Sequence, residues 1–212
     1  MVKHSNERLA SSLPERDAIY DFDIACELDF LDATPDEIVY RKHLFARSIP
    51  SLRQEAAEGN TLAAFRLAKS YLNAWGHTAD MKLAMKWFEV AILANEPIML
   101  FEFGWRLLKG DGLPQEFQRG INILAAAAKG GCADASYFLG SHYATGTDGF
   151  AKIMVTAFHY YLDAARRGHG EAQWNLSRMY ENGEGTKVNK ELAKFWLSES
   201  AKLKYWQALE QA

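Results

Sequence analysis

The sequence predicts an all-α protein, a right-handed α-α superhelix of about four helical pairs with a capping segment at each end. The first observation is an internal repeat, in which Ala63, Met99, Ala135 and Ala172 follow one another at steps of 36, 36 and 37 residues. The second is that apolar residues in each unit recur at i, i+4, i+8 or at i, i+3, i+7, the stripe of an amphipathic helix. The third is that glycine-rich strings separate these stripes, and glycine readily takes the positive φ at which helices end.

Each repeat unit contains two predicted helices. The first helices are expected near residues 61–74, 97–109, 133–145 and 170–182, and the second helices near residues 80–94, 116–129, 151–167 and 189–204. A column of small residues follows the central large apolar residue of each first helix: Ala68, Gly104, Gly140 and Ser177. Such a column is expected where two helix backbones approach closely, because a large side chain would hold them apart.

These columns resemble the Sel-1-like repeat (SLR), a relative of the tetratricopeptide repeat. The fourth unit carries the clearest motif, with Ala172, Leu176, Tyr180, Gly183, Gly185, Ala193 and Trp196 at the motif positions. Three residues depart from the pattern, since Ala68 replaces the usual glycine, Leu107 the usual tyrosine and Gly120 the usual alanine. The resemblance covers about residues 44–206. It implies a solenoid that serves as an adaptor in protein assembly, without naming the partner.

The repeat columns also divide the chain. We expect a disordered N-terminus at 1–13, acidic capping helices with a half repeat at 14–62, repeats at 63–98, 99–134 and 135–171, and the fourth repeat with a C-terminal cap at 172–212. In that cap, Leu203 and Trp206 are expected to face the array.

The N-terminal cap is strongly acidic. Residues 14–37 contain nine acidic residues and one basic residue. Their apolar residues fall near helical spacing and predict a short amphipathic helix docked on the first pair: Ile19, Tyr20, Ile24, Leu28 and Leu31. Thr34, followed by Pro35, Asp36 and Glu37, predicts the start of a helix that runs to about Arg47.

Composition excludes several classes of protein. The chain has 212 residues, 49% of them hydrophobic, which is enough to bury a sizeable core or a repeat array. A formal net charge of -3 argues against nucleic acid as the main partner. The sequence has no stretch of roughly 20 apolar residues that would span a membrane. The lack of a secretory signal and of a disulfide pattern, with only Cys26 and Cys132 present, predicts the cytoplasm.

The residues give little support to catalysis, and no metal or cofactor is expected. The six histidines form no metal-binding motif, and the sequence lacks the short motifs of hydrolases and nucleotide-binding proteins. His142 and His159 lie on different predicted helices of one unit, so a pocket that brought them together with an acid would support a hydrolase. Asp21 and Asp23 have the carboxylates that a divalent ion needs, but a solvated acidic face explains them better.

Binding residues are predicted on the inner faces of the first helices. An aromatic column two residues before each motif leucine suits protein capture, although packing between adjacent pairs explains it about as well: Phe65, Phe101, Tyr137 and Trp174. By analogy with the tetratricopeptide groove, the resemblance implies that further residues point inward: Lys69, Asn73, Trp105, Lys109, Ser141, Arg178 and Glu181. Trp105 is the single residue most strongly favoured as an exposed anchor.

The sequence therefore predicts a non-catalytic protein-interaction module that binds a partner peptide or helix in its groove. Aromatic residues would supply affinity, and Lys69, Lys109 and Arg178 would select polar or acidic groups. One alternative is self-association as a homodimer through an aromatic C-terminal helix that contains Phe195, Trp196, Tyr205 and Trp206. A hydrolase with an unrecognised site is the third alternative. The acidic N-terminal segment either covers the basic groove positions or recruits a basic partner, and both interpretations stay open.

Overall fold

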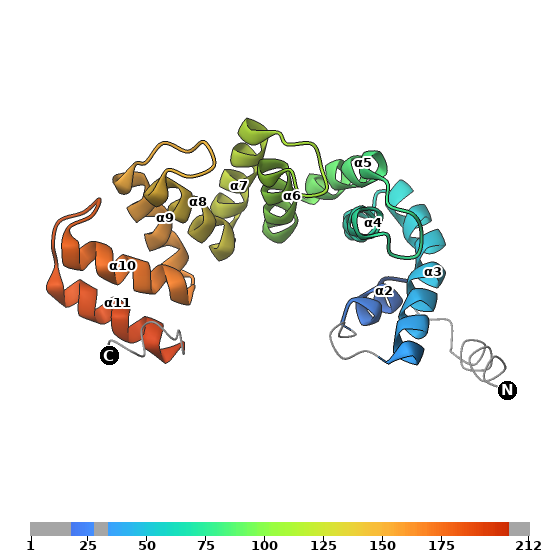
Figure 1. Ribbon diagram of the computed structural model, residues 1–212, viewed down its shortest axis with the longest axis horizontal. Helices are drawn as coiled ribbons and strands as arrows, with labels where there is room; N and C mark the ends of the chain where they lie inside the picture. The colour runs from blue at the N-terminus through green and yellow to red at the C-terminus, as the bar shows by residue number, and fades with distance from the viewer. Residues whose placement is uncertain (1–17, 28–33, 204–212) are drawn as a thin grey trace. The chain divides into compact units, whose positions relative to one another are not determined.

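The computed structural model describes residues 18–27 and 34–203, and within these ranges the regular elements are all helical (Figure 1). The helices are α2 (Ala18–Glu27), α3 (Pro35–Ala57), α4 (Thr61–Asn73), α5 (Met81–Ala91), α6 (Pro97–Lys109), α7 (Phe117–Gly130), α8 (Ala133–Thr145), α9 (Met154–Arg166), α10 (Gly170–Asn182) and α11 (Lys190–Lys202), with a 3₁₀ turn, η1 (Ile92–Ala94), after α5. The expected disorder at 1–13 and the expected position of Trp206 lie outside the described residues.

The predicted helical pairs are confirmed. The starts of α4, α6, α8 and α10 agree with the predicted first helices, and the second helices follow after a turn in each unit. The largest differences are at the start of α9, which begins at Met154 instead of 151, and at the end of α5, which ends at Ala91 instead of 94. The fold is therefore an α-α superhelix of repeated helical pairs. The chain divides into two compact units, Met1–Ala94 (unit 1) and Asn95–Ala212 (unit 2).

Unit 2 contains three helical pairs, α6 with α7, α8 with α9, and α10 with α11. Each pair packs on the next one through the contact of α7 with α8 and the contact of α9 with α10. The small column lies at the close contacts within pairs, as predicted: a Cβ on Gly140 would lie 2.9 Å from the ring of Tyr161. Glycines also end the first helices, since Gly110, Gly146 and Gly183 adopt φ values of 72°, 73° and 73°.

In unit 1, α3 is longer than the sequence predicted. Its predicted start is confirmed, because Thr34 caps the helix and forms a capping box with Glu37. The predicted end near Arg47 is wrong, since the helix continues through Pro50 to Ala57. Buried apolar residues lie on both sides of the proline: Leu44, Phe45, Ile49, Leu52 and Ala56. Their burial outweighs the backbone hydrogen bond that proline cannot make.

The buried face of α2 also differs from the prediction. Ala18, Phe22 and Ala25 are buried, whereas Tyr20 is 52% exposed. Small residues on either side of Phe22 allow α2 to pack closely on α3, and α2 also contacts α4. Leu28 and Leu31, also assigned to the apolar face, lie outside the described residues.

Two further expectations about the ends of the chain are wrong. Asp21 is only 2% exposed and pairs with Arg47, so the predicted solvated acidic face does not include it. The cationic partner on α3 makes this burial tolerable. Leu203, expected to face the array, is 52% exposed at the end of α11.

Candidate functional site

A cavity of about 370 Å³ opens between α8, the start of α9, and α10 in unit 2. Its lining residues are Tyr137, Ser141, Ala144 and Thr145 of α8, Met154 and Tyr161 of α9, Trp174, Asn175, Arg178 and Met179 of α10, and Glu184 in the following turn. Figure 1 shows these helices as neighbours in the yellow-to-orange part of the chain. Gly185, at φ 66°, lies against the carbonyl group of Met154, and no side chain would fit between them. This contact holds the turn that carries Glu184 next to α9.

Aromatic rings form the walls of the cavity. The ring of Tyr137 stacks on His169 at 4.2 Å between centroids and lies 5.9 Å from the ring of Tyr161. On the opposite helix, the guanidinium carbon of Arg178 lies 5.0 Å from the centroid of the Trp174 ring. Stacking of this kind holds both side chains in place, so the walls present rigid apolar surface to a ligand.

Polar groups face the same space. Burial raises the pKa of the Tyr161 phenol, and a hydrogen bond with Ser141 acts in the opposite direction. Thr145 donates its hydroxyl to the Ser141 carbonyl at 2.9 Å. Asn175 adds an amide group from α10. The cavity therefore combines aromatic surface with uncharged hydrogen-bonding groups.

Arg178 is the cation of this cavity. Its side chain is exposed and, within the described ranges, no carboxylate forms an ion pair with it. Glu184 at the rim instead accepts a hydrogen bond from the Asn182 amide at 3.4 Å. An exposed guanidinium group without a carboxylate partner can bind a carboxylate or another anionic group through two parallel hydrogen bonds.

His169 supports the cavity from behind Tyr137. Its Nδ1 accepts a hydrogen bond from the backbone N–H of Ala172 at 3.2 Å and so caps α10. Burial lowers its pKa, while Asp134 and Glu171 oppose this effect. Because Nδ1 acts as an acceptor here, the cap requires that nitrogen to be unprotonated. The neutral imidazole thus fixes both the start of α10 and the ring of Tyr137.

The cavity brings together four of the predicted site residues: Tyr137, Ser141, Trp174 and Arg178. Glu181 is exposed on α10 but does not line it. The three predicted residues of α6 lie elsewhere in unit 2, and each has local partners. Phe101 meets the Phe138 ring edge-on at 6.4 Å, and Trp105 is half-buried with the Arg106 guanidinium 5.9 Å from its ring.

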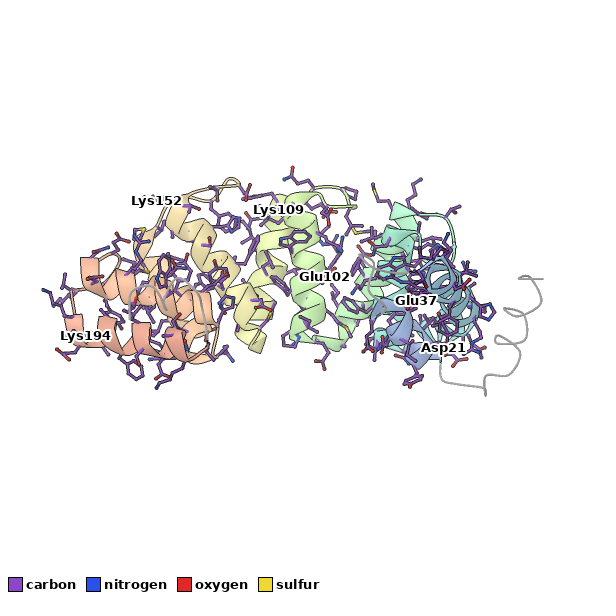
Figure 2. All side chains as sticks on the ribbon, turned by 60° about the horizontal axis from the view of Figure 1, so that its bottom comes forward. Asp21, Glu37, Glu102, Lys109, Lys152 and Lys194 are labelled. Atoms are coloured by element: carbon purple, nitrogen blue, oxygen red, sulfur yellow. The ribbon has the colours of Figure 1, made fainter. Side chains whose placement is uncertain are left out.

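Lys109, labelled in Figure 2, lies at the C-terminal end of α6. It forms an ion pair with Asp148 of the α8–α9 loop. Asp148 also contacts His142, whose Nε2 lies 2.7 Å from its Oδ2. These two hydrogen bonds lower the pKa of the Asp148 carboxyl. The positive charge of Lys109 is therefore already matched within unit 2.

The predicted residues of unit 1 lie on α4. Phe65 packs edge-on against Phe88 at 6.0 Å, and the Lys69 ammonium lies 5.6 Å from the Phe65 ring. Asn73 donates its side-chain amide to the Lys69 carbonyl at 2.8 Å. In this unit the aromatic side chain of Phe65 packs within one helical pair, α4 with α5, whereas the alternative interpretation expected packing between adjacent pairs.

Several cavity residues were not predicted. Thr145 follows Ser141 by four residues and therefore lies on the same face of α8, which is a signal that could have identified it. Asn175, Met154 and Glu184 have no comparable signal. Their positions depend on how the helical pairs pack and on the close contact at Gly185.

His142 and His159, the pair considered for a hydrolase, lie in different surroundings. His142 contacts Phe138 and Asp148, whereas His159 lines a separate cavity of about 440 Å³ with Ser136 and Asp163. In that cavity Ser136 donates its hydroxyl to Asp163 at 2.6 Å, so the serine is not held against a histidine base. Among residues 18–27 and 34–203, no three His, Cys, Asp or Glu side chains group in a way that would hold a metal ion.

These features define an α-helical repeat protein with an open aromatic and cationic cavity between two consecutive helical pairs, α8 with α9 and α10 with α11. Four copies of the Sel1 repeat match the sequence, at residues 61–96, 99–132, 133–169 and 170–205. The chain belongs to the Sel1 repeat family. Members of this family are generally protein-interaction modules and are typically non-catalytic.

Solved structures give the same fold. A Sel1 repeat protein from Oxalobacter formigenes is 23% identical, with a TM-score of 0.71 over 92% of this chain and 76% of that one. The protein c5321 from uropathogenic Escherichia coli, described as a protective antigen with an SLR fold, is 24% identical, with a TM-score of 0.69 over 77% of this chain. The match covers 35% of the length of c5321. At these identities the likeness shows the fold alone.

No helix in the part of the chain that the structure describes is long and apolar enough to cross a membrane.

Proposed function

We propose that this chain is a non-catalytic interaction module that binds a segment of a partner protein in the cavity between α8 and α10. The observation that carries this proposal is the stacked pair of Trp174 and Arg178 opposite Tyr137. Aromatic and arginine side chains in a partly enclosed pocket are the residue types that contribute most to binding energy at protein interfaces.

The three cations predicted to select the partner contribute unequally to this proposal. Lys109 is paired with Asp148, and Lys69 lies against Phe65 in unit 1. Arg178 alone combines exposure, an unpaired charge within the described residues and a place in the cavity. The proposed ligand is accordingly a peptide that presents an apolar side chain to the aromatic walls and an acidic group to Arg178.

A display experiment tests the proposal. The full chain is immobilised and a random peptide library on phage is selected against it, and the enriched peptides are then measured by fluorescence anisotropy. We expect enriched peptides to carry an acidic residue beside an apolar one. The double variant Trp174→Ala, Arg178→Ala should weaken their binding by about 30-fold or more, because two anchor residues are truncated.

The matched control is Lys129→Ala, which removes an exposed cation from a different cavity of unit 2, the one that His159 lines. It should leave peptide binding unchanged. Equal binding by the wild type and the double variant, with both folded by circular dichroism, would contradict the proposal and move the binding surface away from this cavity.

A second candidate function is self-association, favoured by one observation on α11. Exposed apolar side chains lie on α11 and directly before and after it: Val188 before the helix, Leu192 and Phe195 on it, and Leu203 after it. The repeat alignment places the polar residues Lys152, Thr156 and His159 of the previous pair at the positions of the first three. The repeat itself therefore does not demand this apolar stripe. A homodimer seen by light scattering that dissociates on Phe195→Glu would support this function, and a monomer at all concentrations would exclude it.

We also propose a reducing compartment, the cytoplasm, as the site of action. Both Cys26 and Cys132 are free thiols, and burial raises the pKa of the Cys132 thiol. Labelling with a thiol reagent immediately after cell lysis should modify Cys26 in the native protein. Recovery of Cys26 as a disulfide would contradict the proposed location.

A further inference from the structure

Helix α2 lies in a slot of unit 1 that is lined by α3, α4 and the loop after α4. The ring of Phe22 is 1% exposed and contacts Phe45 at 5.2 Å and Trp75 at 5.8 Å, both edge-on. Phe45 and Trp75 stack on each other at 5.1 Å with an interplanar angle of 7°. The slot therefore has a floor of two parallel rings that receives one aromatic side chain.

The loop that carries Trp75 reaches this floor because of a glycine. Gly76 has φ 75°, and a Cβ there would lie 2.9 Å from the carbonyl carbon of Phe45. With any other residue the loop would have to move away from α3. The floor is thus a feature of α3 and its neighbouring loop, and does not need α2 to create it.

Two carboxylates flank Phe22 and meet cations on the walls of the slot. Asp21 accepts a hydrogen bond from Arg47 Nε of α3 at 2.7 Å. Asp23 accepts from Arg66 of α4 in a bidentate pair, with Nε at 2.8 Å and Nη2 as the second donor. The walls therefore carry one arginine on each side of the aromatic floor, so the slot recognises the pattern acid, aromatic, acid on a helix.

The fit of α2 is incomplete. Asp21 Oδ1 and Arg66 Nη1 are buried without a hydrogen-bond partner among the described groups, and buried charged groups left partly unsatisfied weaken an association. In addition, α2 has 10 residues, fewer than an isolated helix needs for stability in water. Its position therefore depends on its contacts with the slot.

We propose that this slot is a docking site for an acidic amphipathic helix of a partner protein, and that α2 is its internal occupant. A partner helix with an aromatic residue between two carboxylates would displace α2 and meet Arg47, Arg66 and the Phe45–Trp75 floor. This surface belongs to unit 1 and is separate from the cavity of the proposed function. On this proposal, the acidic helix α2 covers the basic side chains Arg47 and Arg66 of the slot. The basic groove positions considered in the sequence analysis are different residues.

The probe is a fluorescein-labelled peptide with the sequence of residues 16–29 in which Cys26→Ser removes the thiol. It is titrated into the full chain and followed by fluorescence anisotropy. In the wild type the slot is occupied in cis, so binding should be weak. In the variant Phe22→Ala, α2 loses its aromatic contact, and the peptide should bind at least about 10-fold more tightly than to wild type.

Two controls make the result specific. Tyr20→Ala changes an exposed residue of the same helix and should behave as the wild type does. Adding Arg66→Glu to Phe22→Ala should abolish peptide binding, and a peptide with Asp23→Arg should restore it by reversing the ion pair. Failure of Phe22→Ala to increase binding in a folded chain, or failure of the reversed pair to restore it, would overturn the proposal.

Hydrogen exchange of the wild-type chain gives an independent test that needs no variant. The amides of residues 18–27 should exchange much faster than those of α4, since α2 leaves the slot without unfolding the unit. Exchange as slow as in α4 would overturn the proposal. Light scattering tests whether α2 of a second copy of this chain occupies the slot instead. A wild-type dimer that Phe22→Ala dissociates would support that occupant and would overturn the proposal of a partner protein's helix.

Discussion

Gly104 of α6 and Gly120 of α7 face each other across the first helical pair of unit 2, and a Cβ on Gly120 would lie 2.8 Å from the carbonyl oxygen of Gly104. The same Cβ would lie 2.8 Å from the backbone nitrogen of Leu108. Backbone atoms cannot swing aside as a flexible side chain does. The departure of Gly120 from the alanine usual in the repeat motif is therefore explained by the close approach of these two helices.

The first prediction concerns Gly120→Ala. Helix propensity alone would make this change stabilising by about 1 kcal/mol, because alanine is the better helix former. The contact with α6 should reverse the sign and destabilise the protein by roughly 1–3 kcal/mol through overpacking. Urea unfolding followed by circular dichroism measures the difference. Ala126→Ser, on the exposed side of α7, should change the stability by less than about 0.5 kcal/mol. A more stable Gly120→Ala would contradict the close approach.

The repeat columns predicted the helical pairs because each column reports a local requirement that recurs in every unit. The starts of α4, α6, α8 and α10 agree with the predictions for this reason. Helix α2 and the first part of α3 have no second copy in the sequence to compare. Their structure depends on long-range contacts, such as Asp23 with Arg66, 43 residues away, which no local pattern reveals.

The candidate site was predicted only in part for a related reason. The analogy with the tetratricopeptide groove selected Lys69, Lys109 and Arg178 alike, since it indicates which face of a helix a residue lies on but not which residues neighbour it. Lys109 meets Asp148, 39 residues further along the chain, in the α8–α9 loop. This loop belongs to the unit whose repeat step is 37 residues instead of 36, and it contains the extra residue. The contact of Asp148 with Lys109 therefore has no counterpart in the repeat columns.

The second prediction concerns Asp148, whose pKa is lowered by its hydrogen bonds from Lys109 and His142. A carboxyl group with a lowered pKa in the folded state stabilises the protein above its unfolded pKa of about 3.9 and loses this effect as the pH falls further. Asp148→Asn should therefore lower the thermal midpoint near neutral pH and have a smaller effect near pH 3. Asparagine tolerates the left-handed backbone at this position (φ 51°), so the change tests the charge alone.

Thermal unfolding by circular dichroism at several pH values measures this difference. Glu181→Gln neutralises an exposed carboxylate on α10 and serves as the control. An effect of Asp148→Asn that is as large in acid as at neutral pH would show that the carboxylate does not hold the loop through its charge.

The third prediction concerns His169, whose pKa is lowered by burial. In the unfolded chain the His169 imidazole binds a proton near pH 6.5, whereas in the folded chain it does so only at lower pH. The folded state is therefore fully stabilised above about pH 6.5, and this stabilisation is lost as the pH falls through the lower pKa of the folded chain. His169→Asn keeps an acceptor for the Ala172 N–H and should reduce the fall in thermal midpoint between about pH 7.5 and about pH 5.

His159→Asn is the matched control, because His159 is exposed on α9 and caps no helix. It should retain the wild-type pH dependence. NMR titration of the histidine ring protons gives a direct measurement, and a His169 resonance that titrates above pH 6.5 would contradict the role assigned to burial.

The fourth prediction concerns Arg178 and Lys109, two cations that were both predicted from the sequence to select acidic groups of the partner. The structure assigns the role to Arg178 alone in our proposal. Arg178→Ala should weaken the binding of the display-selected acidic peptides by about 10-fold or more, because the guanidinium group has no competing carboxylate among the described residues. Lys109→Ala should change this affinity by less than about twofold, since Asp148 already holds the ammonium group. Fluorescence anisotropy with one peptide and both variants gives the comparison. If Lys109→Ala weakens binding as much as Arg178→Ala does, the partner must displace Asp148, and the binding surface then extends from the cavity across to α6.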